Sequence, residues 1–318
     1  MQGKRGSQDG VTPPGGLRAG IVRQMTPVYG SSGPRRLAGF VLACAMAVPT
    51  SCRGDVPPEP RLAAETASAF ARYLEQAEAR NAGELRAGTP VFWIDGLPEK
   101  DRAAAYAALK RGEVKLRQLE VRDAAGKKLE CPHGMIHHWA GVIFIPDANL
   151  EDALGLLEDY NQHAKYYSPD VERSQIETHD GDHFRVMMRF RRHKVVTVVL
   201  NTEQDINYFR DSPTRAHSRS SAVRIVQVEN AGRKDERERP EGDDDGFLWR
   251  METWWRMDER DGGVYVQSEA LSLTRDIPTG LGWLIGPFVT GIPRESLSFT
   301  LGATRKGVQE RRQASGGR

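Results

Sequence analysis

The chain has 318 residues, a formal net charge of +2 and 39% hydrophobic residues. This length is ample for a domain with a real core, and the charge is nearly balanced. A nucleic-acid partner is not expected, because phosphate binding needs a concentrated basic face and the basic residues here are mixed with acidic ones.

Residues 1–55 have the character of a targeting segment and flexible N-terminus. Two arginines precede a short apolar run, residues 37–48, which has the length of a signal-peptide core and is too short to span a bilayer. Cleavage after Ala47 and lipid attachment at Cys52 remain alternatives. Either one predicts export to the periplasm or cell envelope, and the second predicts a lipid anchor at Cys52 or contact with a membrane surface.

Residues 56–130 are predicted to be an N-terminal helical and hairpin extension. Helical spacing and an alanine-rich run indicate helices at about 61–81 and 99–111, and a hairpin follows that turns near Ala125 and Gly126. The extension contains few large apolar side chains from which to build a core. We therefore do not expect it to be an independent domain.

Residues 131–312 carry a consistent pattern of one domain, followed by a disordered tail at 313–318. A strand from Ile136 ends at a proline, and an amphipathic helix over residues 149–167 has Asn149 as its expected N-cap. Six strands follow with mostly short connections, which predicts an antiparallel meander. They are expected at about 171–178, 183–191, 195–209, 216–228, 246–257 and 263–275.

The stretch "NAGRKDERERPEGDDDG" interrupts this series of strands. It is highly charged and of low complexity, which predicts a solvated and mobile hairpin tip. The arginines of "RFRRHK", including Arg189 and Arg191, are likewise predicted to form a solvated face of their strand.

Alternation within the strands predicts one apolar and one polar sheet face. Five residues of "GFLWRMETWWRMD" share a parity, namely Phe247, Trp249, Met251, Trp255 and Met257, and charged residues take the other parity. In "DHFRVMMRFRR", Phe184 and Met188 oppose Arg185 and Arg189 in the same way. An apolar face of this size must be covered.

The cover is predicted to come from the C-terminal part of the chain. Leu297, Leu301, Thr304 and Val308 form a stripe at helical spacing, and Pro293 suits the first turn of that helix. Before it, no charged residue occurs between Asp276 and Arg294, yet glycines and prolines break the run. A regular transmembrane helix is not expected there. A lid or pocket wall is favoured, with core packing and contact with a membrane surface as alternatives.

The segment "GGVYVQSEALSLTRDIPTGLGWLIGPFVTGIPRESL" resembles the last strand, gating loop and grip helix of the START-like superfamily, which includes polyketide-cyclase-like and coenzyme-Q-binding proteins. The resemblance covers a little over half of the chain. It implies an α+β helix-grip fold: a curved seven-stranded antiparallel sheet wrapped around a long C-terminal helix. It also implies a cavity between sheet and helix for a hydrophobic ligand.

Alternation and resemblance together predict a ligand-binding site for a lipid, quinone or polyketide-like molecule, so that the protein acts as a carrier or sensor. The small residues Ser268, Ala270 and Ser272 share one face of the last strand, which leaves room for a ligand or, alternatively, forms an ordinary layer under the helix. The predicted lining is Phe184, Met188, Trp249, Met251 and Trp255, the polar contacts are Ser268 and Ser272, and the gate is Trp283, Leu284, Ile285 and Phe288.

Two other functions remain as alternatives. A cyclase or hydrolase-like enzyme could use the same cavity, with His217 or Glu269 as the inward-facing acid or base. An envelope interaction module could dock its partner on the extension and on an exposed Trp254. The sequence favours binding over catalysis, because it contains no nucleophile-elbow, phosphate-loop or dinucleotide motif. No cofactor is predicted.

The segment "CPHGMIHH" gathers Cys131, His133, His137 and His138, residue types that bind metals. On a strand, however, His137 and His138 point to opposite faces. We therefore predict no metal site, and expect a histidine at the sheet rim that is hydrogen-bonded to backbone.

Overall fold

The computed structural model describes residues 61–123, 125–193, 197–276 and 282–316, with the side chains of residues 282–290 excepted. The chain divides into two units, Met1–Gly54 and Asp55–Arg318, and all described residues belong to the second unit. The predicted targeting segment and Cys52 lie outside the described residues.

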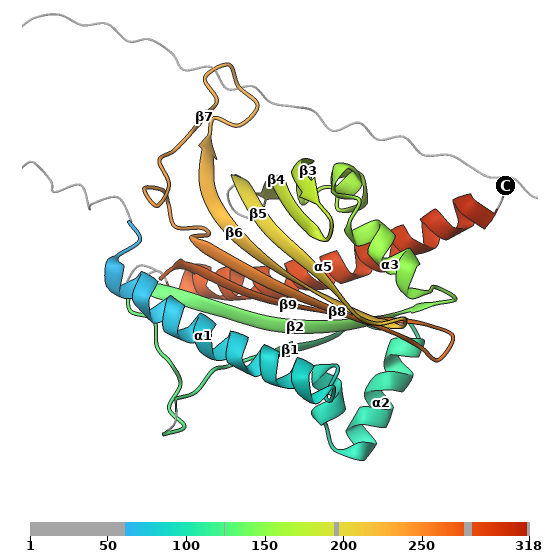
Figure 1. Ribbon diagram of the computed structural model, residues 1–318. Coiled ribbons are helices and arrows are strands. Elements are labelled where there is room, and N and C mark those ends of the chain that lie inside the picture. Colours follow the sequence, from blue (N-terminus) through green and yellow to red (C-terminus); the bar gives the residue numbers. More distant parts are fainter. Residues whose placement is uncertain (1–60, 124, 194–196, 277–281, 317–318) are drawn as a thin grey trace, which may run out of the picture. The chain divides into compact units, whose positions relative to one another are not determined.

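The centre of the fold is a curved antiparallel sheet of nine strands in the order β1-β2-β9-β8-β6-β5-β4-β3, with β7 paired to β6 (Figure 1). The predicted helix-grip fold is confirmed, but the sheet has two strands more than expected. One comes from the extension and one from the charged stretch. The strands are β1 (Lys115–Gln118), β2 (Gly134–Pro146), β3 (Val171–Asp180), β4 (His183–His193), β5 (Thr197–Ser212), β6 (Arg215–Glu229), β7 (Arg237–Glu238), β8 (Arg250–Arg260) and β9 (Gly263–Arg275).

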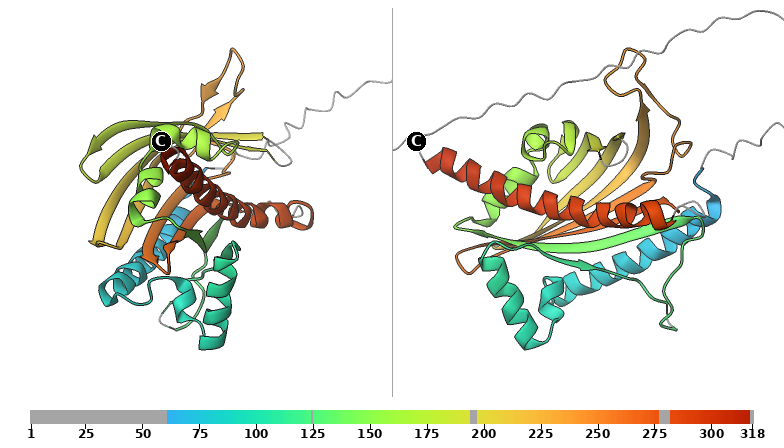
Figure 2. Two further views of the ribbon diagram at one scale, coloured as in Figure 1. Left: turned by 90° about the vertical axis from the view of Figure 1, so that its right-hand side faces the viewer. Right: turned by 180° about the vertical axis from the view of Figure 1, so that it is seen from behind.

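The long helix α5 (Gly282–Gly316) crosses the concave face of the sheet (Figure 2). The predicted stripe is confirmed, because Leu297, Leu301, Thr304 and Val308 are all buried. The helix can approach β2 closely only because position 141 is glycine. A Cβ atom there would lie 2.5 Å from Cδ1 of Leu301.

Helix α5 is longer than the sequence predicted. Pro293 was expected in its first turn, but the helix already starts at Gly282. A proline fixes φ at a helical value, but inside a helix it removes one hydrogen bond and crowds the carbonyl four residues before it, so the helix passes through Pro293 at a local cost in stability. The helix also continues to Gly316, so residues 313–316 are helical where a disordered tail was expected. Among the described residues no helix is both long enough and apolar enough to cross a membrane.

Three short helices connect β2 to β3, where one continuous helix was expected. They are α3 (Leu150–Leu157), η2 (Tyr160–Gln162) and α4 (His163–Tyr166). The predicted N-cap is confirmed, because the Asn149 side chain accepts a hydrogen bond from the backbone N–H of Asp152 at 2.8 Å. The break places Tyr160 and Tyr167 in the core, with both rings buried.

The extension covers the convex face of the sheet. Helix α1 (Ala64–Ala87) lies along this face, and α2 (Glu99–Lys110) follows a short 3-10 helix, η1 (Trp93–Gly96) (Figure 1). Both predicted helices are present. Phe70, Tyr73 and Ala77 of α1 pack against a cluster of sheet residues comprising Trp249, Trp254, Leu271 and Leu273.

Most of residues 230–241 are exposed, which confirms the solvated part of the prediction, but the segment is not an unattached loop. Strand β7 pairs with β6, and Glu236 binds the guanidinium of Arg189 through two contacts of 2.8 and 2.9 Å. Arg189 is only 4% exposed, so it is not on a solvated face. Ion pairs between residues far apart in sequence therefore hold this charged segment in place.

Candidate functional site

Small and polar side chains occupy the middle of the concave face. In one row across three strands, Ser218 of β6, Trp255 of β8 and Ser268 of β9 are neighbours. In the next row, Ser220, Thr253 and Ala270 are neighbours in the same strand order. Apart from Trp255, the side chains of these two rows are small.

Six uncharged polar side chains define what we call the concave patch: Gln204, Ser218, Ser220, Thr253, Ser268 and Ser272. Ser218 and Ser268 are 1% and 2% exposed. Within the described part of the chain, the hydroxyls of Ser218, Thr253, Ser268 and Ser272 have no hydrogen-bond partner. Thr253 and Ser272 are half-buried, and none of the four hydroxyl oxygens is fully enclosed, so all four can still form hydrogen bonds.

The remaining two members belong to a directed chain of hydrogen bonds. Ser220 donates to Oε1 of Gln204 at 3.1 Å, and Nε2 of Gln204 donates to the Thr202 hydroxyl at 3.1 Å. Thr202 in turn donates to the backbone oxygen of Met188 at 3.3 Å. This chain fixes the orientation of the Gln204 amide and leaves one of its N–H groups unused.

Sequence reasoning missed Thr202, Gln204, Ser218 and Ser220. Their position follows only from the register of β4 and β5, in which Thr202 pairs with Met188 and Gln204 pairs with Val186. Because "LNTEQDINYF" has no clear apolar alternation, the face of each residue could not be read before the pairing was known.

Apolar side chains surround the concave patch. Phe184 and Met188 belong to the main core cluster, and Trp139, Trp255 and Phe299 are partly buried against it. Of the predicted lining and polar contacts, the structure places Phe184, Met188, Met251, Trp255, Ser268 and Ser272 on the concave face. The predicted gate residues Trp283, Leu284, Ile285 and Phe288 have side chains outside the described residues.

The prediction for Trp249 is wrong. Its ring packs in the cluster beneath α1 on the convex side, and Nε1 donates to Asp244 at 3.1 Å. Trp249 precedes β8, so strand alternation does not set its direction. Phe247, expected on the same apolar face, is 42% exposed. Trp254, expected to be exposed, is only 6% exposed and lies under α1 with the Arg219 guanidinium 4.6 Å from its ring centroid.

One titratable side chain lies on the concave side of β2. His137 pairs in register with Ser272, and its Nε2 lies 3.0 Å from the Thr274 hydroxyl. Burial lowers the pKa of His137 to about 4, so the ring is neutral at neutral pH. His138 points to the opposite face, as expected, and the described residues contain no cluster that could hold a metal ion.

Neither predicted catalytic residue faces the concave side. Glu269 lies under α1, where it accepts hydrogen bonds from His138 at 2.8 Å, Asn81 at 3.1 Å and Arg80. Burial alone would raise its pKa, but the bond from His138 and the charge of Arg80 hold the pKa at about 2. His217 stacks on Phe209 with ring centroids 4.7 Å apart, on the outer surface.

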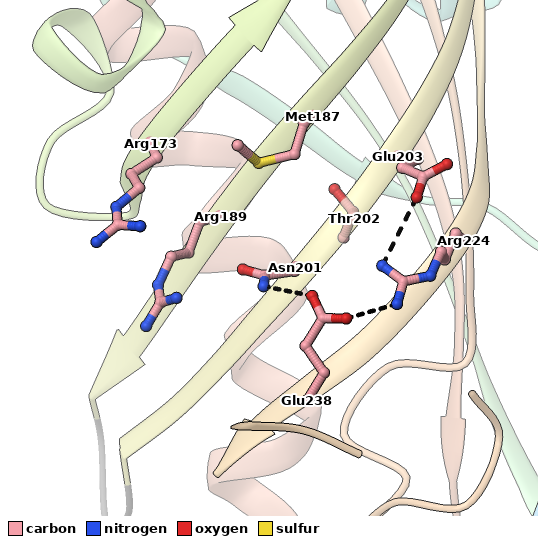
Figure 3. Close-up of a pocket in the computed structure, with 8 residues that line it drawn as sticks. All are labelled: Arg173, Met187, Arg189, Asn201, Thr202, Glu203, Arg224 and Glu238. Atoms are coloured by element: carbon pink, nitrogen blue, oxygen red, sulfur yellow. Dashed lines mark hydrogen bonds and ion pairs between the residues drawn. The ribbon is translucent and has the colours of Figure 1, made fainter. Parts of the chain in front are cut away.

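A hollow of about 230 Å³ lies on the convex side of β3 to β6 (Figure 3). Three of its charged groups pair within the hollow: Arg224 contacts Glu203 at 3.6 Å and Glu238 at 2.6 Å. Glu238 also accepts a hydrogen bond from Asn201 at 2.7 Å. These contacts join β7 to the sheet, which favours a structural role for this hollow.

Comparison with known proteins finds similar structures only. No family model matches the chain, and no curated protein sequence matches it. The STAR-related lipid transfer protein of Xanthomonas axonopodis (fragment 25–204) is 16% identical with a TM-score of 0.39, covering 60% of this chain and 98% of that one. The Zhui aromatase/cyclase of Streptomyces sp. R1128 is 13% identical with a TM-score of 0.37, covering 57% and 99%.

Human STARD10 is 9% identical with a TM-score of 0.38, covering 67% of this chain and 81% of that one. The three include kinds of protein that the sequence resembles, and the likeness is one of fold. Similarity at this level says nothing about a ligand of this chain.

Proposed function

We propose that this protein binds a hydrophobic small molecule, such as a lipid, quinone or polyketide-like compound, between the concave patch and α5, and serves as its carrier or sensor. The observation that carries the proposal is the concave patch itself. It combines small side chains and unpartnered buried hydroxyls with apolar surroundings, which is the composition of a ligand pocket rather than of a packed core.

The energetics of such binding are favourable. Each methylene group buried contributes about 0.8 kcal/mol, so a ligand with ten carbons gains roughly 8 kcal/mol before the costs of association. Trp139, Trp255 and Phe299 provide partly buried apolar surface for this contact. Spare hydroxyls of the patch then orient the polar end of the ligand.

Binding is better supported than catalysis. General acid-base chemistry needs titratable groups within reach of the ligand, and Glu269 and His217 both lie on the convex side. His137 is the described titratable residue on the concave side of β2, with its pKa lowered to about 4. The interaction-module alternative loses its expected anchor, because Trp254 is buried.

Export and a lipid anchor at Cys52 are also proposed, from the sequence of residues 1–55 alone. Intact mass spectrometry of the mature protein from its own host tests this. The expected mass is that of a chain beginning at Val48 with an unmodified Cys52, or of a chain beginning at a lipid-modified Cys52. A mature chain that keeps the apolar run of residues 37–47 would contradict export.

The function is tested by native mass spectrometry of the full protein purified gently from its host, followed by organic extraction. A stoichiometric lipid, quinone or polyketide should accompany it. Ser268→Trp should fill the space beside Trp255 and lower uptake at least about ten-fold, because overpacked sites exclude ligand. Thr178→Trp, which adds the same ring at an exposed position of β3, is the matched control.

Circular dichroism must show that both variants stay folded. A protein that arrives empty and takes up none of a panel of lipids, quinones and polyketides would contradict the proposed function. Equal uptake by Ser268→Trp and Thr178→Trp would contradict the location of the site.

A further inference from the structure

The chemistry of the concave patch restricts the kind of ligand that fits it, if the proposed function holds. All six side chains of the patch are uncharged, and they supply hydroxyl and amide groups only. The charged neighbours on the same strands, Glu252, Arg256 and Glu269, alternate onto the convex face. Arg192, a cation of the concave side on β4, is paired with Asp170 at 2.7 Å.

The adjoining sequence adds no charge. Between Asp276 and Arg294 the chain contains neither an acidic nor a basic residue. His137, with its pKa lowered to about 4 by burial, is neutral at neutral pH. Apart from the Arg192–Asp170 ion pair, the described concave surface therefore offers a ligand hydrogen bonds rather than a counter-ion.

Hydrogen-bonding capacity is directed toward this surface. Ser220 uses its proton on Gln204, so its oxygen can accept a further bond, while Gln204 keeps one N–H to donate. Ser218 and Ser268 are almost fully buried and have no side-chain partner among the described residues. Their hydroxyl oxygens are not fully enclosed, so they keep bonding capacity that a polar group of the ligand can use.

We propose that the concave patch binds a hydrophobic molecule whose polar end is an uncharged hydroxyl or carbonyl group, and that it discriminates against ligands with a charged head group. A hydroxyl or carbonyl exchanges bonds with water for bonds with the patch at little net cost. A carboxylate, phosphate or ammonium group would lose its hydration without gaining a counter-ion, which is far more costly.

Two ligands with the same acyl chain test this inference. We would titrate the full protein with 1-oleoylglycerol, whose head group is neutral, and with 1-oleoyl lysophosphatidate, whose head group is anionic, and follow binding by native mass spectrometry and tryptophan fluorescence. The neutral ligand should bind at least about ten-fold more tightly, because the anion is buried without a partner.

Ser220→Lys sharpens the test. Ser220 is only half-buried, so a lysine can be accommodated there with its ammonium at the edge of the patch. This variant should narrow or reverse the preference in favour of lysophosphatidate. Thr178→Lys, at an exposed position of β3, should leave the preference unchanged. Gln204→Leu is a second variant of similar volume, and it should weaken binding of the neutral ligand without improving that of the anion.

The outcomes separate this inference from the proposed function. Binding of both ligands with equal or greater affinity for the anion would overturn the inference and leave the proposed function standing. Failure of both ligands, together with an empty protein from the host, would overturn the proposed function. If the protein prefers 1-oleoylglycerol but neither Ser220→Lys nor Gln204→Leu changes that preference, the concave patch is not the site that binds the head group.

Discussion

The two faces of the sheet bury polar groups of different kinds: charged groups in ion pairs on the convex face and uncharged hydroxyls on the concave face. On the convex face, Glu269 is surrounded by His138, Asn81 and Arg80 beneath α1. On the concave face, one residue earlier in β9, Ser268 is equally buried and has no partner in the described part of the chain. The bonds to Glu269 all reach Oε1, while its Oε2 has no partner among the described residues. The convex face therefore holds a charged group among charged and polar neighbours of α1, whereas the concave face presents uncharged hydroxyls that are available to a ligand.

The convex network is extended by two further contacts. Tyr73 accepts a hydrogen bond from the backbone N–H of Val121 at 3.1 Å, and its hydroxyl lies 3.1 Å from Nδ1 of His138. A neutral His138 ring that donates from Nε2 to Glu269 accepts the tyrosine proton at Nδ1. A tyrosine, a histidine and a carboxylate in this order also occur in catalytic sites. Here they are buried under α1, and they hold α1 against the sheet.

The largest expected effect comes from breaking this convex network. Glu269→Gln removes the carboxylate that binds both His138 and Arg80, and loss of one partner from a buried pair costs about 3 kcal/mol or more of unfolding free energy. Chemical denaturation measures this. As a control, Glu113→Gln removes a carboxylate from an exposed ion pair and should leave the denaturation midpoint unchanged. A loss no larger than that of the control would show that the network does not fasten α1.

The dependence of stability on pH should distinguish the buried histidines from the buried Glu269 of the convex face, because they titrate in different pH ranges. His137 on the concave face and His163 in the core have pKa values lowered to about 4, so the stability from keeping them neutral is complete above pH 6.5 and is lost as the pH falls to 4. Glu269 has its pKa lowered from 4.5 to about 2, so its stability is complete above pH 4.5 and is lost toward pH 2.

Each of these three groups should contribute about 3 kcal/mol across its own window. Denaturant unfolding at pH 7, 5 and 4 measures the first window, and His137→Gln should reduce the fall in unfolding free energy between pH 7 and 4 by roughly half. Unchanged pH dependence in this variant would show that His137 is not held neutral by burial.

A smaller effect is expected where α5 meets the concave face. Gly141→Ala brings a methyl group to within 2.5 Å of Leu301 and 2.7 Å of Leu116, both flexible side chains, so the cost should be about 1 to 2 kcal/mol. Gly302→Ala, on α5 itself with open space around it, should instead stabilise the protein by about 0.5 to 1 kcal/mol. Thermal unfolding of the two variants checks the opposite signs, and equal signs would contradict the close approach of α5 to β2.

The sequence by itself determined the elements and their patterns. Period-2 alternation in β4 and β8 predicted which residues share a face, the spacing of Leu297, Leu301 and Val308 predicted the buried stripe of α5, and Asn149 predicted the start of α3. These signals are local, because they depend on strand or helix periodicity and on one capping bond.

Only the tertiary structure decided what covers each face. Glu269 meets Arg80 from 189 positions away, and Arg189 meets Glu236 from 47 positions away, so no local pattern could show that these charges are buried and paired. Trp249 and Trp254 lie under α1 for the same reason. Alternation assigns a residue to one of two faces, but burial, charge pairing and free hydrogen-bonding capacity depend on which distant segment packs there.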